Sequence, residues 1–117
     1  MPPDSRDRAL LWDMYDYAYE ATLISAGLSF EGAKDAREVI YALRYVIFAI
    51  GEAASHVSLS FQEAHAEIKW AEIIGMRNIL AHDYRGTRDD IVWDSATRGA
   101  AELLGLLKPL IGEQRPG

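Results

Sequence analysis

Apolar residues recur every three or four positions along most of the chain, and this spacing predicts helices. The first apolar stripe runs from Leu10 to Leu28. Asp4 or Ser5 can cap its start, and Gly27 is the expected stop. We therefore expect a long N-terminal helix.

A second long helix is expected after residue 35, because Asp35 and Glu38 have the spacing of a capping box. Its main apolar stripe runs from Val39 to Val57. Another apolar strip lies on a different side of this helix and contains Tyr41, Tyr45 and Phe48. A helix that is apolar on two sides is usually central in its bundle or lies at a subunit interface, and we expect both.

Three further helical patterns follow. Residues 60–67 predict one or two turns, and residues 70–81 predict a third long helix. Gly86 and Thr87, with Asp90 three positions later, are typical of a new helix start. The last helix then carries one buried stripe, made of Val92, Ala96, Ala100, Leu103, Leu107 and Leu110, and a second row that includes Trp93, Leu104 and Ile111.

The distribution of proline supports long helices over turn-rich β structure, because residues 4–108 contain none. A chain of 117 residues fits one domain, which we place at residues 1–117. The sequence therefore predicts a single all-α domain, an up-down bundle of four to five helices with short connections.

Composition excludes several classes of protein. Hydrophobic residues make up 50% of the chain and charged residues 26%, which is typical of a globular domain. The absence of cysteine excludes disulfides, a thiolate nucleophile and cysteine-ligated zinc, and it favours an intracellular, cytoplasmic location. No stretch is long enough to span a membrane. The net charge of −6 disfavours indiscriminate nucleic-acid binding.

Several conspicuous residues are better explained by structure than by chemistry. His56 and His65 have no carboxylate at metal-ligand spacing, so we interpret them as surface or helix-end histidines and expect no metal and no cofactor. Asp89 and Asp90 fit the positive end of a helix dipole. The tryptophans fit core or interface anchors, and they are Trp12, Trp70 and Trp93.

The segment GMRNILAHDYRG, residues 75–86, resists such an explanation. A guanidinium (Arg77), an amide (Asn78) and an imidazole (His82) occur within six residues at the end of an otherwise apolar helix. An arginine can bind a phosphate bidentately and stabilise developing charge, and a histidine can transfer a proton near neutral pH. Together these groups can cleave RNA without a metal when the neighbouring 2′-hydroxyl is the nucleophile.

Helix geometry constrains this pair. Arg77 and His82 are five residues apart, so an ideal helix separates their directions by about 140°. Convergence then needs a curled arginine, a helix that ends near Ala81, or a second subunit. Asn78 lies four residues before His82 and can hydrogen-bond to its ring.

A purely structural interpretation also remains open at this point. Arg77 can pair with Glu52 or Glu72, while His82 and Tyr84 finish the helix with ordinary cap contacts. The R-x4-H spacing alone arises easily by chance.

The wider sequence resembles a known family. Arg77-x4-His82-x-Tyr84 is similar to the R-x4-H-x-Y motif of HepT-like HEPN-domain ribonucleases, the toxin partners of MntA-type nucleotidyltransferase antitoxins. Three further segments match that family, with Lys69 standing where proline is common. They are Ile50-Gly-Glu-Ala-Ala54, Trp70 followed by Glu72-Ile and Gly-Met-Arg-Asn, and Ile91-Val-Trp-Asp94.

The resemblance implies a HEPN-like bundle that forms a homodimer, with two R-x4-H sites along a shared cleft. It implies metal-independent endoribonuclease activity on RNA, with Arg77 and His82 as the catalytic pair. Asn78 and Glu52 match supporting polar positions of the family. The basic residues Lys69, Arg85 and Arg88 are then candidates for a local RNA-binding patch.

The resemblance also implies regulation. Tyr84 matches the tyrosine to which the nucleotidyltransferase antitoxin adds AMP, which would place negative phosphate near Arg77. A second interpretation belongs to a different class: a non-catalytic helical binding partner of a nucleotidyltransferase, which the acidic charge favours.

Overall fold

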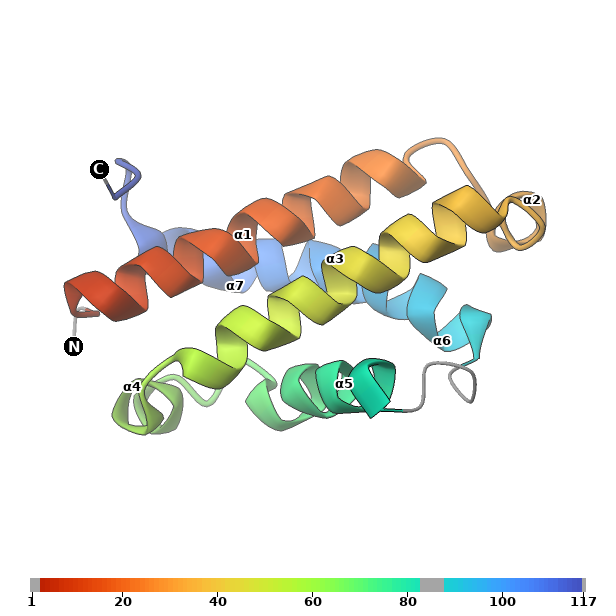
Figure 1. Cartoon of the computed structure of the whole chain (residues 1–117). Coiled ribbons are helices and arrows are strands. Elements are labelled where there is room, and N and C mark those ends of the chain that lie inside the picture. The colour runs from red at the N-terminus through yellow and green to blue at the C-terminus, as the bar shows by residue number, and fades with distance from the viewer. Residues whose placement is uncertain (1–2, 83–87, 117) are drawn as a thin grey trace.

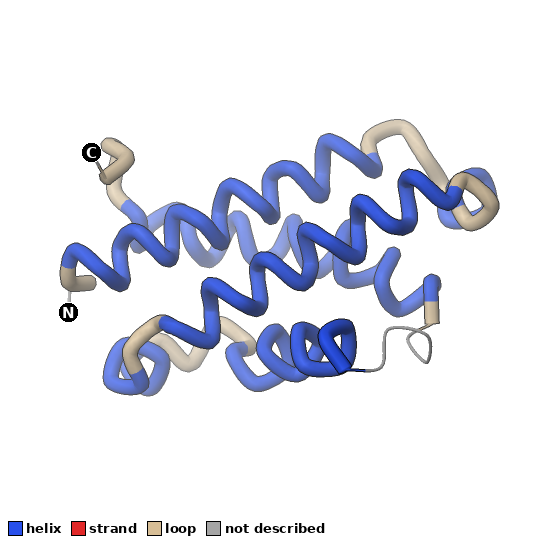
Figure 2. Tube along the Cα trace, viewed as in Figure 1, coloured by secondary structure: helices blue, strands red, loops and turns tan. Residues whose placement is uncertain are grey.

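The computed structural model describes residues 3–82 and 88–116, and within these ranges the chain is helical with no strand (Figures 1 and 2). The predicted all-α class is therefore confirmed. The elements in chain order are α1 (Ser5–Ser25), α2 (Phe30–Ala33), α3 (Arg37–His56), α4 (Leu59–Ala64), α5 (Trp70–His82), α6 (Asp89–Asp94), the π-helical turn η1 (Ser95–Gly99) and α7 (Ala100–Ile111). None of the helices in the described ranges is long and apolar enough to cross a membrane.

The long segments alternate in direction. In Figure 1, α1 and α3 run antiparallel side by side, α5 reverses again, and the continuous α6–η1–α7 segment returns to the end of the molecule where α1 begins. Helix α3 packs against α1, α5 and α6, so its predicted central position is confirmed. The up-down bundle follows from this alternation.

The predicted limits of the first helix are correct. The Asp4 carboxylate accepts a hydrogen bond of 2.7 Å from the backbone N–H of Asp7 and caps α1. Gly27 has a φ of 74°, a left-handed conformation that glycine adopts without steric cost, and it follows the last turn of α1. The buried Asp7 carboxylate accepts hydrogen bonds from the N–H and hydroxyl of Ser58, which ties α1 to the start of α4.

The predicted capping box at Asp35 is wrong. Helix α3 begins at Arg37, its N-cap is Ala36, and no side chain caps it. The connection from α1 is taken up by α2, a short helix capped by the Ser29 side chain that the sequence pattern did not predict. Helix α2 buries Ala33 and is followed directly by a turn. Helix α3 then begins two residues after Asp35.

The last long segment contains a π-helical turn that the apolar spacing did not predict. Its buried stripe is Val92, Ala96, Ala100, Leu103, Leu107 and Ile111. The steps across η1 are four residues each, wider than the 3.6 residues of an α-helical turn. Ile111, expected in the second row, is buried at the end of this stripe, and Leu110, the expected end, is only half-buried.

Candidate active site

Helices α3 and α5 are in close contact at Gly51. A Cβ atom at Gly51 would lie 2.2 Å from the Cβ of Arg77 and 2.9 Å from the carbonyl oxygen of Ile73. Real Cβ atoms do not approach other heavy atoms so closely, so this crossing requires glycine. The sequence pair Gly51-Glu52 therefore brings the base of the Arg77 side chain directly against α3.

The guanidinium of Arg77 is held by side chains from two helices. Its Nε donates a hydrogen bond of 3.1 Å to Oε1 of Glu52, and its Nη2 lies 3.0 Å from the same oxygen. Its Nη1 donates a hydrogen bond of 3.0 Å to Oδ1 of Asn78, and the ring centroid of Phe48 lies 5.4 Å from the guanidinium carbon. Among the described residues two of its five N–H groups donate hydrogen bonds, so N–H groups on Nη1 and Nη2 remain that can reach a phosphate.

Of the two carboxylates that the sequence offered to Arg77, the structure selects Glu52. This ion pair is expected if Arg77 has a purely structural role. It is equally expected if Arg77 binds a phosphate, because such an arginine must be held in a fixed direction. Both side chains keep access to solvent, with 26% of the Arg77 side chain and 44% of the Glu52 side chain exposed. The arginine is therefore fixed in direction without being buried.

His82 is the last residue of α5 and is exposed. The hydrogen bond that Asn78 could make to His82 is not found among the described residues, and the Asn78 amide oxygen accepts one from Arg77. In the described part of the chain no hydrogen bond or ion pair joins Arg77 to His82. Helix α5 continues through His82, beyond the expected end near Ala81, so the angular separation of about 140° persists within one copy.

Glu52 also lines a groove between α1 and α3. It has a volume of about 280 Å³, and we call it the α1/α3 groove. Its walls are Leu10, Asp13 and Tyr17 from α1 and Tyr45, Phe48, Ala49, Glu52, Ala53 and His56 from α3. The sequence analysis missed this groove; its signal is the pair Ala49 and Ala53, small residues one turn apart that leave the space unfilled.

Asp89 fixes the start of α6 on α3. Its carboxylate oxygens accept hydrogen bonds of 2.9 Å from Arg37 and 2.7 Å from Arg44. Desolvation alone would raise the pKa of Asp89, but the two arginines outweigh it and hold the pKa below its ordinary value. The expected position of Asp89 at a helix start is correct, and this ion pair adds a tertiary role that the sequence did not reveal.

Tyr84 lies outside the described residues, as do Arg85, Gly86 and Thr87, so the expectations for them are not tested. The described neighbours on the two sides are His82 at the end of α5 and Arg88 before α6.

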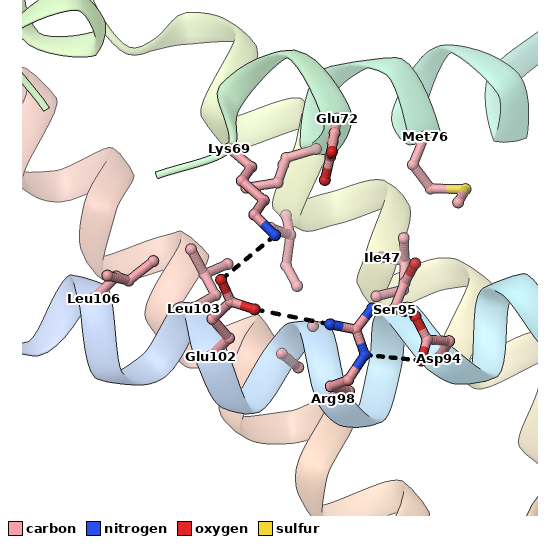
Figure 3. Close-up of a pocket in the computed structure, with 14 residues that line it drawn as sticks. Ile47, Lys69, Glu72, Met76, Asp94, Ser95, Arg98, Glu102, Leu103 and Leu106 are labelled. Atoms are coloured by element: carbon pink, nitrogen blue, oxygen red, sulfur yellow. Dashed lines mark hydrogen bonds and ion pairs between the residues drawn. The ribbon is translucent and has the colours of Figure 1, made fainter. Parts of the chain in front are cut away.

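The expected basic patch around the arginine is not formed by its described members. Lys69 lies 3.6 Å from Glu102, and Arg88 lies 2.5 Å from Asp90. Lys69 instead borders a second pocket, of about 230 Å³, between α5 and α7 (Figure 3). There a chain of ion pairs runs from Lys69 through Glu102 and Arg98 to Asp94 above apolar side chains, so the cations are already compensated.

The histidines and tryptophans set aside from the sequence take the expected positions. His56 ends α3, and His65 follows α4 with its ring stacked on Phe61 at 4.2 Å. Trp70 is buried and donates a hydrogen bond of 2.9 Å to the His65 carbonyl oxygen. Trp12 is half-buried and donates to the Ile111 carbonyl oxygen at 3.1 Å. Trp93 packs on the core from one side.

Comparison with known proteins shows the family of the chain. The family model described as "Ribonuclease HepT-like" matches residues 14–110, which include Gly51, Glu52, Arg77 and His82. The chain therefore belongs to the HepT-like ribonuclease family, and the resemblance seen in its motifs is confirmed.

The individual relatives below are 27–33% identical to this chain over the parts that align. A "Putative RNase" of Caldanaerobacter subterraneus subsp. tengcongensis is 33% identical over 66 residues, which are 56% of this chain and 59% of that protein. A "Putative RNase" of Methanocaldococcus jannaschii is 27% identical over 86 residues, 74% of this chain and 79% of that protein. A "Probable ribonuclease HepT" of Thermococcus cleftensis is 33% identical over 61 residues, 52% of this chain and 56% of that protein. No solved structure matches significantly.

Proposed function

We propose that this chain is a metal-independent endoribonuclease, the toxin of a toxin–antitoxin pair, and that Arg77 and His82 form its active site. The observation that carries the proposal is the held but accessible Arg77 guanidinium, in a chain of the HepT-like ribonuclease family. Membership in that family supports RNA as the substrate.

The proposed reaction uses the RNA's own 2′-hydroxyl. The 2′-oxygen attacks the adjacent phosphorus, the bond from phosphorus to the 5′-oxygen breaks, and a 2′,3′-cyclic phosphate and a 5′-hydroxyl result. Arg77 binds the non-bridging oxygens and stabilises their growing charge through its remaining N–H donors. His82 transfers a proton from the 2′-hydroxyl or to the 5′-oxygen. Glu52 and Asn78 are positioning residues that orient the guanidinium.

A homodimer resolves the angular problem in this proposal. Arg77 and His82 of one copy point in directions about 140° apart, so they converge poorly on one phosphodiester. Two copies arranged about a two-fold axis bring the arginine of one into a cleft shared with the histidine of the other.

We further propose that a nucleotidyltransferase antitoxin silences the site through Tyr84. The tyrosine oxygen bonds to the α-phosphorus of ATP, the bond between the α-phosphate and the β-phosphate breaks, and pyrophosphate leaves with the hydroxyl proton going to solvent or a base. In an uninterrupted helix Tyr84 would share a face with Arg77, seven residues earlier. The attached phosphate competes with RNA for the guanidinium.

The test incubates the purified protein with total RNA in the presence of a chelator. Cleavage by the wild type, its loss in Arg77→Ala and His82→Ala, and its retention in Arg98→Ala are expected, because Arg98 is an arginine already paired with Asp94 and Glu102. Failure of the wild type to cleave, or cleavage unaffected by His82→Ala, would overturn the proposal.

A second candidate function is a non-catalytic helical partner of a nucleotidyltransferase. The net charge of −6 favours it. Growth arrest on expression without the partner, relieved by Arg77→Ala, is expected of the toxin and not of a binding module.

A further inference from the structure

The aromatic strip of α3 leads directly to Arg77. Tyr41, Tyr45, Phe48 and Glu52 recur at helical spacing along one side of α3. The Phe48 ring lies under the Arg77 guanidinium, and the Glu52 carboxylate holds it. Both residues also line the α1/α3 groove, so the groove and the candidate active site share a wall.

The groove combines flat apolar surfaces with hydrogen-bonding groups. The rings of Tyr17 and Tyr45 meet edge to face at 6.2 Å, and Phe48 continues the aromatic lining toward Glu52. On the wall from α1, Asp13 offers a carboxylate for which the described residues supply no hydrogen bond or ion pair. On the wall from α3, the Nε2 of His56 lies 4.0 Å from Oε1 of Glu52.

We infer that the α1/α3 groove is a base-binding subsite for single-stranded RNA, in which a base next to the phosphate bound by Arg77 stacks on Tyr45. The inference rests on the proposed function and adds the place where an unpaired base would bind. Aromatic side chains beside a cation are the usual platform for single-stranded nucleic acid, because every base has a flat face to stack. The Asp13 carboxylate accepts hydrogen bonds, so it favours a base edge that presents N–H groups.

The contents of the groove favour a nucleotide over a purely apolar occupant. A nucleotide has a flat ring and an anionic phosphate, and the site offers aromatic rings next to a guanidinium in the same order. An apolar segment of another protein would leave the Asp13 carboxylate facing it without a partner, which is costly when water is excluded. The competing occupant, the same face of a second copy, is separated by the test below.

Two tyrosines of α3 provide a matched comparison. Tyr45 is 61% exposed and lines the groove, while Tyr41 is 60% exposed and lies outside it. Within the described ranges the Tyr45 ring contacts Tyr17, and the Tyr41 ring contacts the Arg37 guanidinium. Replacement of either by alanine removes a similar exposed ring, so a difference in RNA binding reports on the groove itself.

The experiment measures binding of a fluorescent single-stranded RNA whose 2′-oxygens are methylated, which blocks cleavage. Fluorescence anisotropy gives the Kd for the wild type, Tyr45→Ala and Tyr41→Ala, and sedimentation gives the oligomeric state of each. We expect Tyr45→Ala to raise the Kd at least tenfold, in line with the loss of one stacked base, and Tyr41→Ala to change it less than twofold. A duplex of the same sequence should bind more weakly than the single strand.

Equal Kd values for the two variants would overturn the inference, and so would a Tyr45→Ala variant that changes oligomeric state, because the groove would then be an interface between copies. These outcomes are separable from failure of the proposed function. Cleavage that needs His82, together with Tyr45-independent binding, rejects the subsite alone. Tyr45-dependent binding without any cleavage by the wild type rejects the ribonuclease and keeps the subsite.

Discussion

Gly51 of α3 and Arg77 of α5 pack so closely that a methyl group on the glycine would lie 2.2 Å from the arginine Cβ. Gly51→Ala should therefore force the helices apart, with an expected loss of about 1–3 kcal/mol in the free energy of unfolding and a loss of RNA cleavage. Gly75→Ala on α5 is the control, because a Cβ there meets nothing within 4 Å. Urea unfolding should show Gly75→Ala as stable as the wild type or more so. A fully stable Gly51→Ala protein would contradict the packing argument.

Glu52→Gln tests the positioning of Arg77. The Glu52 side chain is 44% exposed, so its ion pair should contribute less than about 1 kcal/mol to stability. Its loss frees the guanidinium to rotate, and kcat for RNA cleavage should fall about tenfold with little change in Tm. The matched control is Glu102→Gln on α7, a carboxylate that is 43% exposed and also pairs with cations. Equal kcat values for the two variants would show that Glu52 does not position Arg77.

Asp89→Asn should lower the free energy of unfolding by an amount that depends on pH. The pKa of Asp89 is lower in the folded state, so its contribution to stability is present at neutral pH and is lost as the pH falls below its ordinary value of 3.8. We expect the variant to lose about 1 kcal/mol in urea unfolding at pH 7 and to approach the wild type near pH 3.

Asp94→Asn serves as the comparison for Asp89. The Arg98 side chain, through its hydrogen bond, lowers the pKa of Asp94 as well, but that pair is exposed and lies within one helix segment, so its effect at pH 7 should be smaller. A difference between Asp89→Asn and the wild type that is the same at pH 7 and pH 3 would show that the ion pair is not its cause.

Tyr84→Phe tests the proposed silencing. The phenylalanine lacks the oxygen that would receive AMP, so the variant should remain toxic when the nucleotidyltransferase is co-expressed. Mass spectrometry should find added AMP on the wild-type peptide that contains Tyr84 and none on the variant. Tyr19→Phe removes a hydroxyl from an exposed tyrosine of α1 and should still be silenced. An unmodified wild-type peptide would count against this part of the proposal.

The long helices were predictable from their apolar spacing, and α1 and α5 lie close to their expected limits. Local signals failed where a tertiary contact decided the outcome. The capping-box spacing at Asp35 does not start a helix, because α2 takes up the connection and α3 begins at Arg37. The four-residue spacing allowed a hydrogen bond from Asn78 to His82, but the Asn78 amide oxygen accepts one from Arg77. From the sequence, either Glu52 or Glu72 could pair with Arg77. The structure shows the pair with Glu52, because the close contact at Gly51 brings Arg77 against α3.

The π-helical turn at Ser95–Gly99 holds one residue more than an α-helical turn would. Deletion of one residue within it would let the turn close to an α-helical one, so Leu103 and Leu107 would keep their direction toward the core. Deletion of one residue within Ala100–Ile111 would instead rotate every later side chain by about 100° relative to those before it. The C-terminal segment should therefore tolerate the loss of a residue in the π-helical turn far better than the loss of one in α7.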